Sequence, residues 1–315
     1  MKIKLIKLYV LIFVLVFSGF IFGGPRSSEY VGSSKCITCH SSMHPKICRG
    51  WQHTPHHLVM KEISEDEDIP GDFSVNSVFK KEDIKYIIGY KSGRYTYIGF
   101  DFTVFPLQWM EKDSAWKERA SADASMTCFG CHTTGYFVSS KEFVEPGIGC
   151  EVCHGPGEKH VKSEGSIEFI VNPKKLSRDR SRMICGQCHS AGNDPSGKFG
   201  FPIMSDGIDS ATDEKILRPF IPGEDLTLGF VDAKPKVAKR SDEYSSLMQA
   251  PDYFAKLICT DCHDPHNKQN NPSMLIDASN GTCLKCHEDY TKDLAVHKEV
   301  DKKHCWECHK YAHTH

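Results

Sequence analysis

One five-residue pattern, Cys-x-x-Cys-His, occurs seven times along the 315-residue chain. Two cysteines at this spacing can form thioether bonds to the vinyl groups of a haem, and the histidine after them then lies beneath the iron and binds it. The pattern is therefore typical of covalent c-type haem attachment. The expected thioether cysteines are Cys36, Cys39, Cys128, Cys131, Cys150, Cys153, Cys185, Cys188, Cys259, Cys262, Cys283, Cys286, Cys305 and Cys308, and the expected proximal ligands are His40, His132, His154, His189, His263, His287 and His309.

A Cys-x-x-Cys pair alone also occurs in zinc sites and in redox-active dithiols. Histidine makes up 17 of the 315 residues, so chance would place it directly after a given pair about one time in twenty. Here it follows all seven pairs. Zinc sites have no reason to fix a histidine at that position, whereas haem ligation requires it, so the sequence predicts seven covalently bound haems, each with its iron.

The N-terminus has the pattern of a secretory signal over residues 1–24. Three lysines precede an apolar run of fifteen residues, Leu8 to Phe22, which is shorter than the roughly twenty residues that span a bilayer. The alternative is an uncleaved anchor, which would associate the protein with a membrane. We expect export to the periplasm or the cell surface, where haem is attached to chains of this kind.

The numbers of cysteines and of charged residues further limit the possible classes of protein. Fourteen of the 15 cysteines lie in the motifs and leave only Cys48, so a framework of disulfides is excluded. The formal charge is −2, and each haem adds about one negative charge because two propionates outweigh the ferric centre. An acidic holoprotein argues against binding nucleic acid and favours redox partner proteins that carry basic patches.

We expect residues 25–315 to form one haem-cytochrome domain, mostly irregular, with short α-helices and a small β-ribbon. About 41 residues per haem are too few to build an apolar core around each one, so the haems themselves should form the core. The motif-free segment 61–127 contains β-branched and aromatic runs around residues 84–90, 94–98 and 102–105, which predict a hairpin or a three-stranded ribbon. The segment 259–315 carries three motifs and is the densest in haem.

Histidine is in excess of what the motifs use. Ten histidines remain for a second axial position: His44, His53, His56, His57, His160, His266, His297, His304, His313 and His315. Seven bis-histidine haems would need seven of them, so every iron can be six-coordinate. Bis-histidine ligation closes the iron to substrates and gives a lower potential than His/Met ligation. The excess therefore favours electron transfer over chemistry at iron.

Several stretches resemble the cytochrome c-554-like multihaem cytochromes. These are Tyr30-Val-Gly-Ser-Ser-Lys-Cys-Ile-Thr-Cys-His40, Trp51 with Thr54-Pro-His-His-Leu-Val-Met60, Pro106-Leu-Gln-Trp109, Cys-His-Thr-Thr-Gly135-Tyr136, Gly147-Ile-Gly-Cys-Glu-Val-Cys-His-Gly-Pro-Gly157 and Cys-His-Asp-Pro-His266. The resemblance implies angled and stacked haem pairs, mostly bis-histidine ligation, and electron transfer between periplasmic or extracellular partners. It also places a distal ligand at His56.

The distal ligands that we favour are His56, His160, His266 and His297, followed by His44, His53 and His304. The leading hypothesis is an exported heptahaem electron carrier with no catalytic acid, base or nucleophile. A second hypothesis is an enzyme, a reductase or oxidase of a small nitrogen or sulfur compound at one open haem. A third is a homo-oligomer or extracellular filament in which a histidine of one subunit binds a haem of the next.

Overall fold

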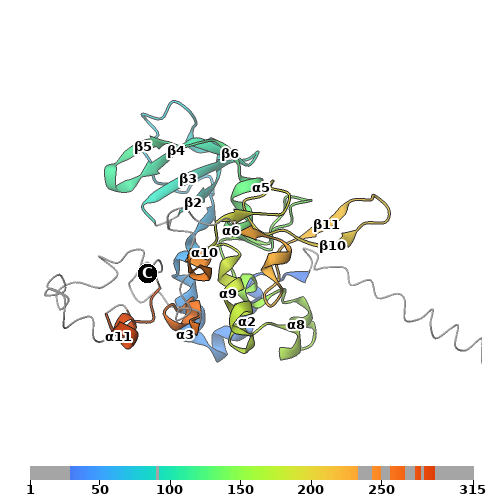
Figure 1. Cartoon of the computed structure of the whole chain (residues 1–315). Coiled ribbons are helices and arrows are strands. Elements are labelled where there is room, and N and C mark those ends of the chain that lie inside the picture. Colours follow the sequence, from blue (N-terminus) through green and yellow to red (C-terminus); the bar gives the residue numbers. More distant parts are fainter. Residues whose placement is uncertain are drawn as a thin grey trace, which may run out of the picture.

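The computed structural model describes residues 29–89, 92–232, 243–249, 256–266, 274–277 and 280–287. The signal-like segment, the seventh motif (Cys305, Cys308 and His309) and the candidate ligands His297 and His304 lie outside the described residues. Figure 1 shows a β-sheet on one side of the molecule and a group of short helices on the other. Among the described residues, no helix is both long and apolar enough to cross a membrane.

The sheet is built almost entirely from the motif-free segment. Its six antiparallel strands are β1 (Met60–Glu62), β2 (Ile84–Ile88), β3 (Arg94–Gly99), β4 (Thr103–Met110), β5 (Ala115–Glu118) and β6 (Ala122–Asp123). They pair in the order β1-β2-β3-β4-β5, and β6 also pairs with β4. The predicted ribbon is therefore present as β2, β3 and β4, and three further short strands extend it.

Both faces of this sheet are buried. Ile87, Tyr95 and Tyr97 on one face pack with Ile69 and Phe79 from the loop before β2. The other face contributes Tyr86, Ile98 and Val104 to a second cluster, which includes Phe129 of the second motif and Phe201. Burying apolar area on both faces stabilises the sheet without any cofactor. This part of the chain therefore has an apolar core of its own, which the count of residues per haem did not predict.

The helices are short, and most of them carry or flank a motif. They are α2 (Ser33–Met43), α3 (Pro45–Gln52), α4 (Pro55–Leu58), α5 (Ala124–Thr127), α6 (Phe129–His132), α7 (Cys150–His154), α8 (Glu158–Lys162), α9 (Arg178–Gly186), α10 (Glu243–Met248) and α11 (Gly281–His287). Pairs of short strands lie between them: β7 (Thr133–Thr134) with β8 (Glu145–Pro146), β9 (Gly192–Asn193) with β12 (Val231–Asp232), and β10 (Met204–Ile208) with β11 (Lys215–Arg218).

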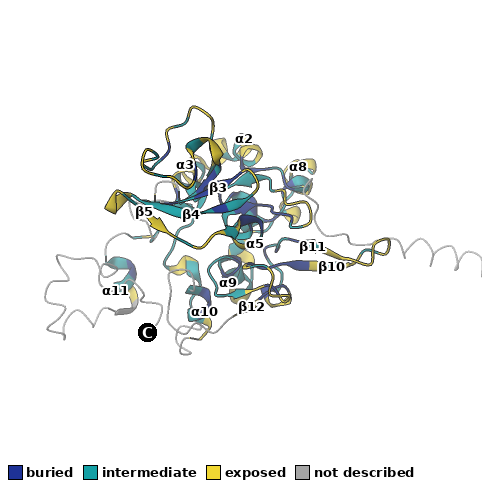
Figure 2. Cartoon of the chain, turned by 90° about the horizontal axis from the view of Figure 1, so that it is seen from above, coloured by how far each residue is buried: buried dark blue, intermediate teal, exposed yellow. Residues whose placement is uncertain are grey.

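These helices bury few side chains of their own. Ser33 is the one buried residue of α2 and Trp51 that of α3, while α8 has none. Figure 2 shows the same contrast, with exposed and half-buried colouring on α2, α3 and α8 and buried residues on β3 of the sheet. Isolated helices of four to eleven residues are unstable in water. The helices α2, α3 and α8 therefore depend on packing against another group, as expected for helices folded around haem.

Candidate haem-binding site

The described motifs each occupy one turn of helix or a 3₁₀ turn. The first lies in α2, the second at α6, the third in α7, the fourth at the end of α9, the fifth in a 3₁₀ turn at Cys259–Asp261 and the sixth in α11. In one helical turn the two cysteines and the histidine share a face, because residues three and four apart lie above one another. Each of the first five motifs can therefore present both thiols and the imidazole to the same group.

Three proximal histidines each lie opposite a second histidine from a distant part of the chain. The ring centroids are 6.2 Å apart for His40 and His160, 6.2 Å for His154 and His266, and 6.0 Å for His189 and His56. An iron bound on both faces separates two imidazole centroids by about 6 Å, since each metal–nitrogen bond is about 2 Å and each ring centre lies about 1 Å behind its nitrogen. The three pairs therefore fit one iron each.

His44 and His53 are arranged differently. The ring of His44 is 5.9 Å from that of His40, a separation that follows from their i, i+4 spacing at the end of one helix. Two residues on one face of a helix cannot bind opposite faces of a haem, so His160 is the better partner of His40. His53 is exposed with Nδ1 2.7 Å from the carbonyl of Arg49, and no ring contact joins it to a proximal histidine among the described residues.

Hydrogen bonds to the ring nitrogens set the tautomer of several histidines. Nδ1 of His154 donates to the carbonyl of Val171, and Nδ1 of His160 to that of Ser166, both at 2.9 Å. Because a carbonyl oxygen only accepts, the proton lies on Nδ1 and the lone pair on Nε2 is available to a metal. Nδ1 of His189 lies instead 3.1 Å from a carboxylate oxygen of Glu243, which raises the pKa of His189.

Burial keeps other rings neutral. Desolvation lowers the pKa of His56 and of His132 to about 4, with nearby His189 adding to the effect in both cases. A neutral imidazole is the form that binds a metal. His132 is the proximal histidine of the second motif, and its Nδ1 is buried with no hydrogen-bond partner among the described residues. These neutral rings fit iron ligation.

His56 reaches the fourth motif because its segment is fixed to the loop before the third. Thr54 caps α4, accepting a hydrogen bond from the backbone N–H of His57. The indole N–H of Trp51 donates to the carbonyl of Ile148 at 3.0 Å, and the backbone N–H of Ile148 donates to the carbonyl of His56 at 2.9 Å. Gly147 approaches so closely that a Cβ there would lie 2.3 Å from the carbonyl oxygen of His57. This contact requires glycine.

Thiols of different motifs also meet. The thiols of Cys36 and Cys150 lie close enough to affect each other, which raises the pKa of Cys36 and lowers that of Cys150. The same kind of contact joins Cys185 to Cys259 and Cys188 to Cys131. The first attachment site therefore adjoins the third, and the fourth adjoins both the second and the fifth.

Two carboxylates hold the first and third motifs together. Glu151, only 1% exposed, accepts hydrogen bonds from the backbone N–H groups of Val31, Gly32 and Gly157 at 2.7–2.9 Å. Burial raises the pKa of Glu151, and the three donors oppose that rise. Glu145 accepts from the N–H and the hydroxyl of Ser33, and that hydroxyl accepts from the N–H of Cys150. Together they join the start of α2 to α7.

Glu151→Gln should therefore destabilise the protein by about 2 kcal/mol, because an amide presents a donor to at least one buried N–H group. For a chain of this size we expect a fall of roughly 5 °C in melting temperature, measured by circular dichroism on the haem-loaded protein. The exposed Glu142 provides the control. Equal melting temperatures for Glu151→Gln and Glu142→Gln would contradict the role of this carboxylate.

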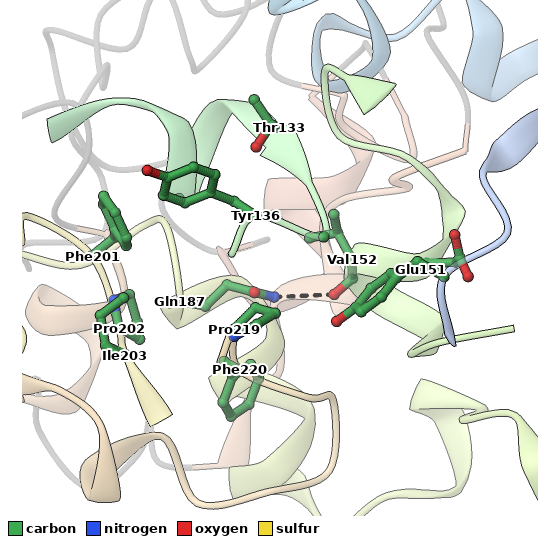
Figure 3. A pocket seen from close by; sticks show the side chains of 13 residues that line it. Thr133, Tyr136, Glu151, Val152, Gln187, Phe201, Pro202, Ile203, Pro219 and Phe220 are labelled. Carbon is green, nitrogen blue, oxygen red and sulfur yellow. Dashed lines mark hydrogen bonds between the residues drawn. The ribbon is translucent and has the colours of Figure 1, made fainter. Parts of the chain in front are cut away.

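The second, third and fourth motifs pack through the residues between their cysteines. Gly130, Val152 and Gln187 line a small cavity of about 30 Å³, and the amide nitrogen of Gln187 donates to the carbonyl of Val152 at 3.1 Å (Figure 3). The cavity is far smaller than a porphyrin. Since residues between the cysteines lie on the opposite side of a helical turn from the thiols, the cysteines and histidines face away from it.

Sequence reasoning missed the side chains that position the motifs. Gln187, Glu151 and Glu243 are examples, as is Arg182, whose guanidinium donates to the carbonyl of Leu257 at 2.7 Å and thereby fixes the fifth motif beside the fourth. Glu151 and Gln187 occupy the variable positions of Cys-x-x-Cys-His, where polar residues are ordinarily solvated. Their partners are distant backbone groups, so no local pattern identifies them.

The motifs, the short helices and the matches to family models make this chain a multihaem c-type cytochrome that binds haem covalently. Residues 107–155 match the family described as cytochrome c554 and c-prime, and residues 254–292 match the doubled CXXCH motif. Over 160 residues, 48% of its length, the chain is 26% identical to the multiheme cytochrome MtrA of Shewanella baltica (strain OS185). The match spans 46% of that relative's length.

Two solved structures share the fold. The outer cell wall cytochrome OcwA has a TM-score of 0.62 and 24% identity, covering 82% of this chain and 67% of that one. An undecaheme cytochrome from the S-layer of Carboxydothermus ferrireducens has a TM-score of 0.51 and 21% identity, covering 84% of this chain and 43% of that one. Both neighbours are cytochromes, the second one an undecaheme cytochrome, and the mostly irregular architecture with short helices and small sheets agrees with the predicted fold class.

Proposed function

We propose that this chain is an exported electron carrier with seven haems, most of which are ligated by two histidines. When bound, each haem iron would take up and release one electron. The observation that carries the proposal is the spacing of the three imidazole pairs, at 6.0–6.2 Å between segments more than 100 residues apart. A six-coordinate iron leaves no position for a substrate, which favours electron transfer over catalysis.

The ligand assignments follow from these pairs. His160 would complete the first site, His266 the third and His56 the fourth. His44 is not proposed for the first iron, because it shares a helix face with His40, and His53 contacts no proximal histidine among the described residues. His297 and His304 remain predicted ligands for those sites at which the described residues provide no second histidine. His309 likewise remains the predicted proximal ligand of the seventh site.

Contacts between thiols support a branched arrangement of the attachment sites. The fourth site adjoins the second through Cys188 and Cys131 and the fifth through Cys185 and Cys259. The amide of Gln187 in the fourth motif donates to the carbonyl of Val152 in the third at 3.1 Å, which supports a third site near the fourth. The first site adjoins the third. In this arrangement the fourth site is a junction between the second, third and fifth sites, and the first site connects to it through the third.

Export and partners are proposed from the same features. A periplasmic or cell-surface location is supported by the signal-like residues 1–24 and by the haem chemistry. The names of the two structural neighbours, which refer to an outer cell wall and an S-layer, also support it. Acidic surface charge favours donor and acceptor proteins with basic patches. A filament held by a histidine donated between subunits remains a hypothesis, which electron microscopy of cell-surface material tests.

Two measurements on protein purified from an exporting host test the proposal. We expect an intact mass equal to the mature chain plus seven haems, and a ferric spectrum dominated by low-spin bis-imidazole signals that do not change on adding nitrite or cyanide. Fewer haems would contradict the count. A large high-spin fraction that binds these ligands would instead support the competing hypothesis of an enzyme acting at an open haem.

A further inference from the structure

The proximal histidine of the fourth motif has an anionic partner. Nδ1 of His189 lies 3.1 Å from Oε2 of Glu243, whereas Nδ1 of His154 donates to a neutral backbone carbonyl. The two side chains are about half-exposed and one-third exposed in this structure, at 45% for His189 and 36% for Glu243. The two proximal histidines therefore differ in the charge of the group that accepts their Nδ1 proton.

The contact is fixed by its surroundings and does not depend on the two side chains alone. The residue after Glu243, Tyr244, donates its backbone N–H to the carbonyl of His189 at 2.7 Å. The hydroxyl of buried Ser245 accepts the N–H of Ala191 at 2.9 Å. The Tyr244 ring packs so closely on Gly186 that a Cβ there would lie 2.7 Å from it. The first turn of α10 is thus docked on both sides of the histidine.

A carboxylate that accepts a hydrogen bond from Nδ1 makes the imidazole a stronger electron donor through Nε2. A more basic axial ligand stabilises the ferric state relative to the ferrous state, and hydrogen bonding and charge around the ligand are among the means by which a protein sets a haem potential. A neutral carbonyl lowers the haem potential less, since hydrogen bonds to charged groups are stronger than those between neutral groups.

We propose that Glu243 is a positioning residue that lowers the reduction potential at the fourth attachment site. The inference rests on the proposed ligation by His189 and extends it. Because the fourth site adjoins the second, third and fifth, a carboxylate there would set the potential of the junction relative to its neighbours. Electrons would then tend to leave the junction towards the adjoining sites.

The test is a redox titration of the haem-loaded protein carrying Glu243→Gln, followed by optical and electron paramagnetic resonance spectra. We expect one haem to shift towards a higher potential, with a roughly tenfold change in its ferric-to-ferrous equilibrium, or about 59 mV for one electron. The haem content and the low-spin character should stay as in the wild type. Glu118→Gln, which removes an exposed carboxylate on β5, serves as the control for loss of charge.

A second variant, Glu243→Asp, keeps the charge but withdraws it by one methylene, so its potential should lie between those of the wild type and Glu243→Gln. If Glu243→Gln fails to incorporate haem, the haem potentials of Glu243→Asp still test the proposal. Unchanged potentials in the variants that do load, or an equal shift in Glu118→Gln, would overturn the role of Glu243. The proposed function fails separately, if the wild type lacks seven haems or bis-imidazole signals.

Discussion

Replacing His160 by methionine is expected to raise the reduction potential of one haem by about 120 mV, which is a roughly hundredfold shift towards the ferrous state. The reason is that a thioether is a weaker donor to ferric iron than an imidazole. His160 faces His40 at 6.2 Å between centroids, with Nδ1 engaged by the carbonyl of Ser166. Potentiometry resolves the change as one wave leaving the low-potential group, while the haem count stays the same.

His53→Met is the matched control, because His53 is exposed and meets no proximal histidine among the described residues. It should leave all potentials unchanged. His44→Met distinguishes the remaining alternative for the first iron. A shift in His44→Met without one in His160→Met would show that the i, i+4 neighbour binds the iron and would overturn the pairing proposed above.

The second large effect, on stability, is expected from Gly147→Ala, which adds one methyl group. Gly147 has φ of +79°, and its added Cβ would lie 2.3 Å from the carbonyl oxygen of His57. Side chains rarely adopt this backbone conformation, and a backbone carbonyl cannot move away as a flexible side chain can. We expect Gly147→Ala to destabilise the protein by about 3 kcal/mol or more, adding the clash to the strain of the positive φ.

The same change should also be visible in the haem spectra. Displacing the backbone of residues 56–57 withdraws His56 from His189, so one haem should become high-spin and bind cyanide. Gly197→Ala is the control, since Gly197 has φ of +72° but nothing within 4 Å of its added Cβ. It should cost only the backbone strain, about 1–2 kcal/mol, and should leave the spectrum low-spin. Equal behaviour of the two variants would contradict the role of Gly147 in placing His56.

Local sequence patterns determined where haem can be attached and where the main strands form. The thioether cysteines and proximal histidines are fixed by a five-residue spacing, because one helical turn suffices to bring two thiols and one imidazole to the same group. The β-branched and aromatic runs of β2, β3 and β4 likewise predicted their strands, since such side chains pack well on the pleated surface of a sheet. The existence of a multihaem chain could therefore be read without tertiary structure.

The pairing of candidate axial histidines, the neighbours of each motif and the side chains that hold the motifs could be found only in three dimensions. Ten spare histidines were indistinguishable by type, and the structure placed three of them opposite proximal rings more than 100 residues away. Contacts such as Glu151 with Val31, or Glu243 with His189, join distant segments through single hydrogen bonds. Such contacts leave no periodic pattern in the sequence, because they depend on how irregular segments pack, and packing is a property of the whole chain.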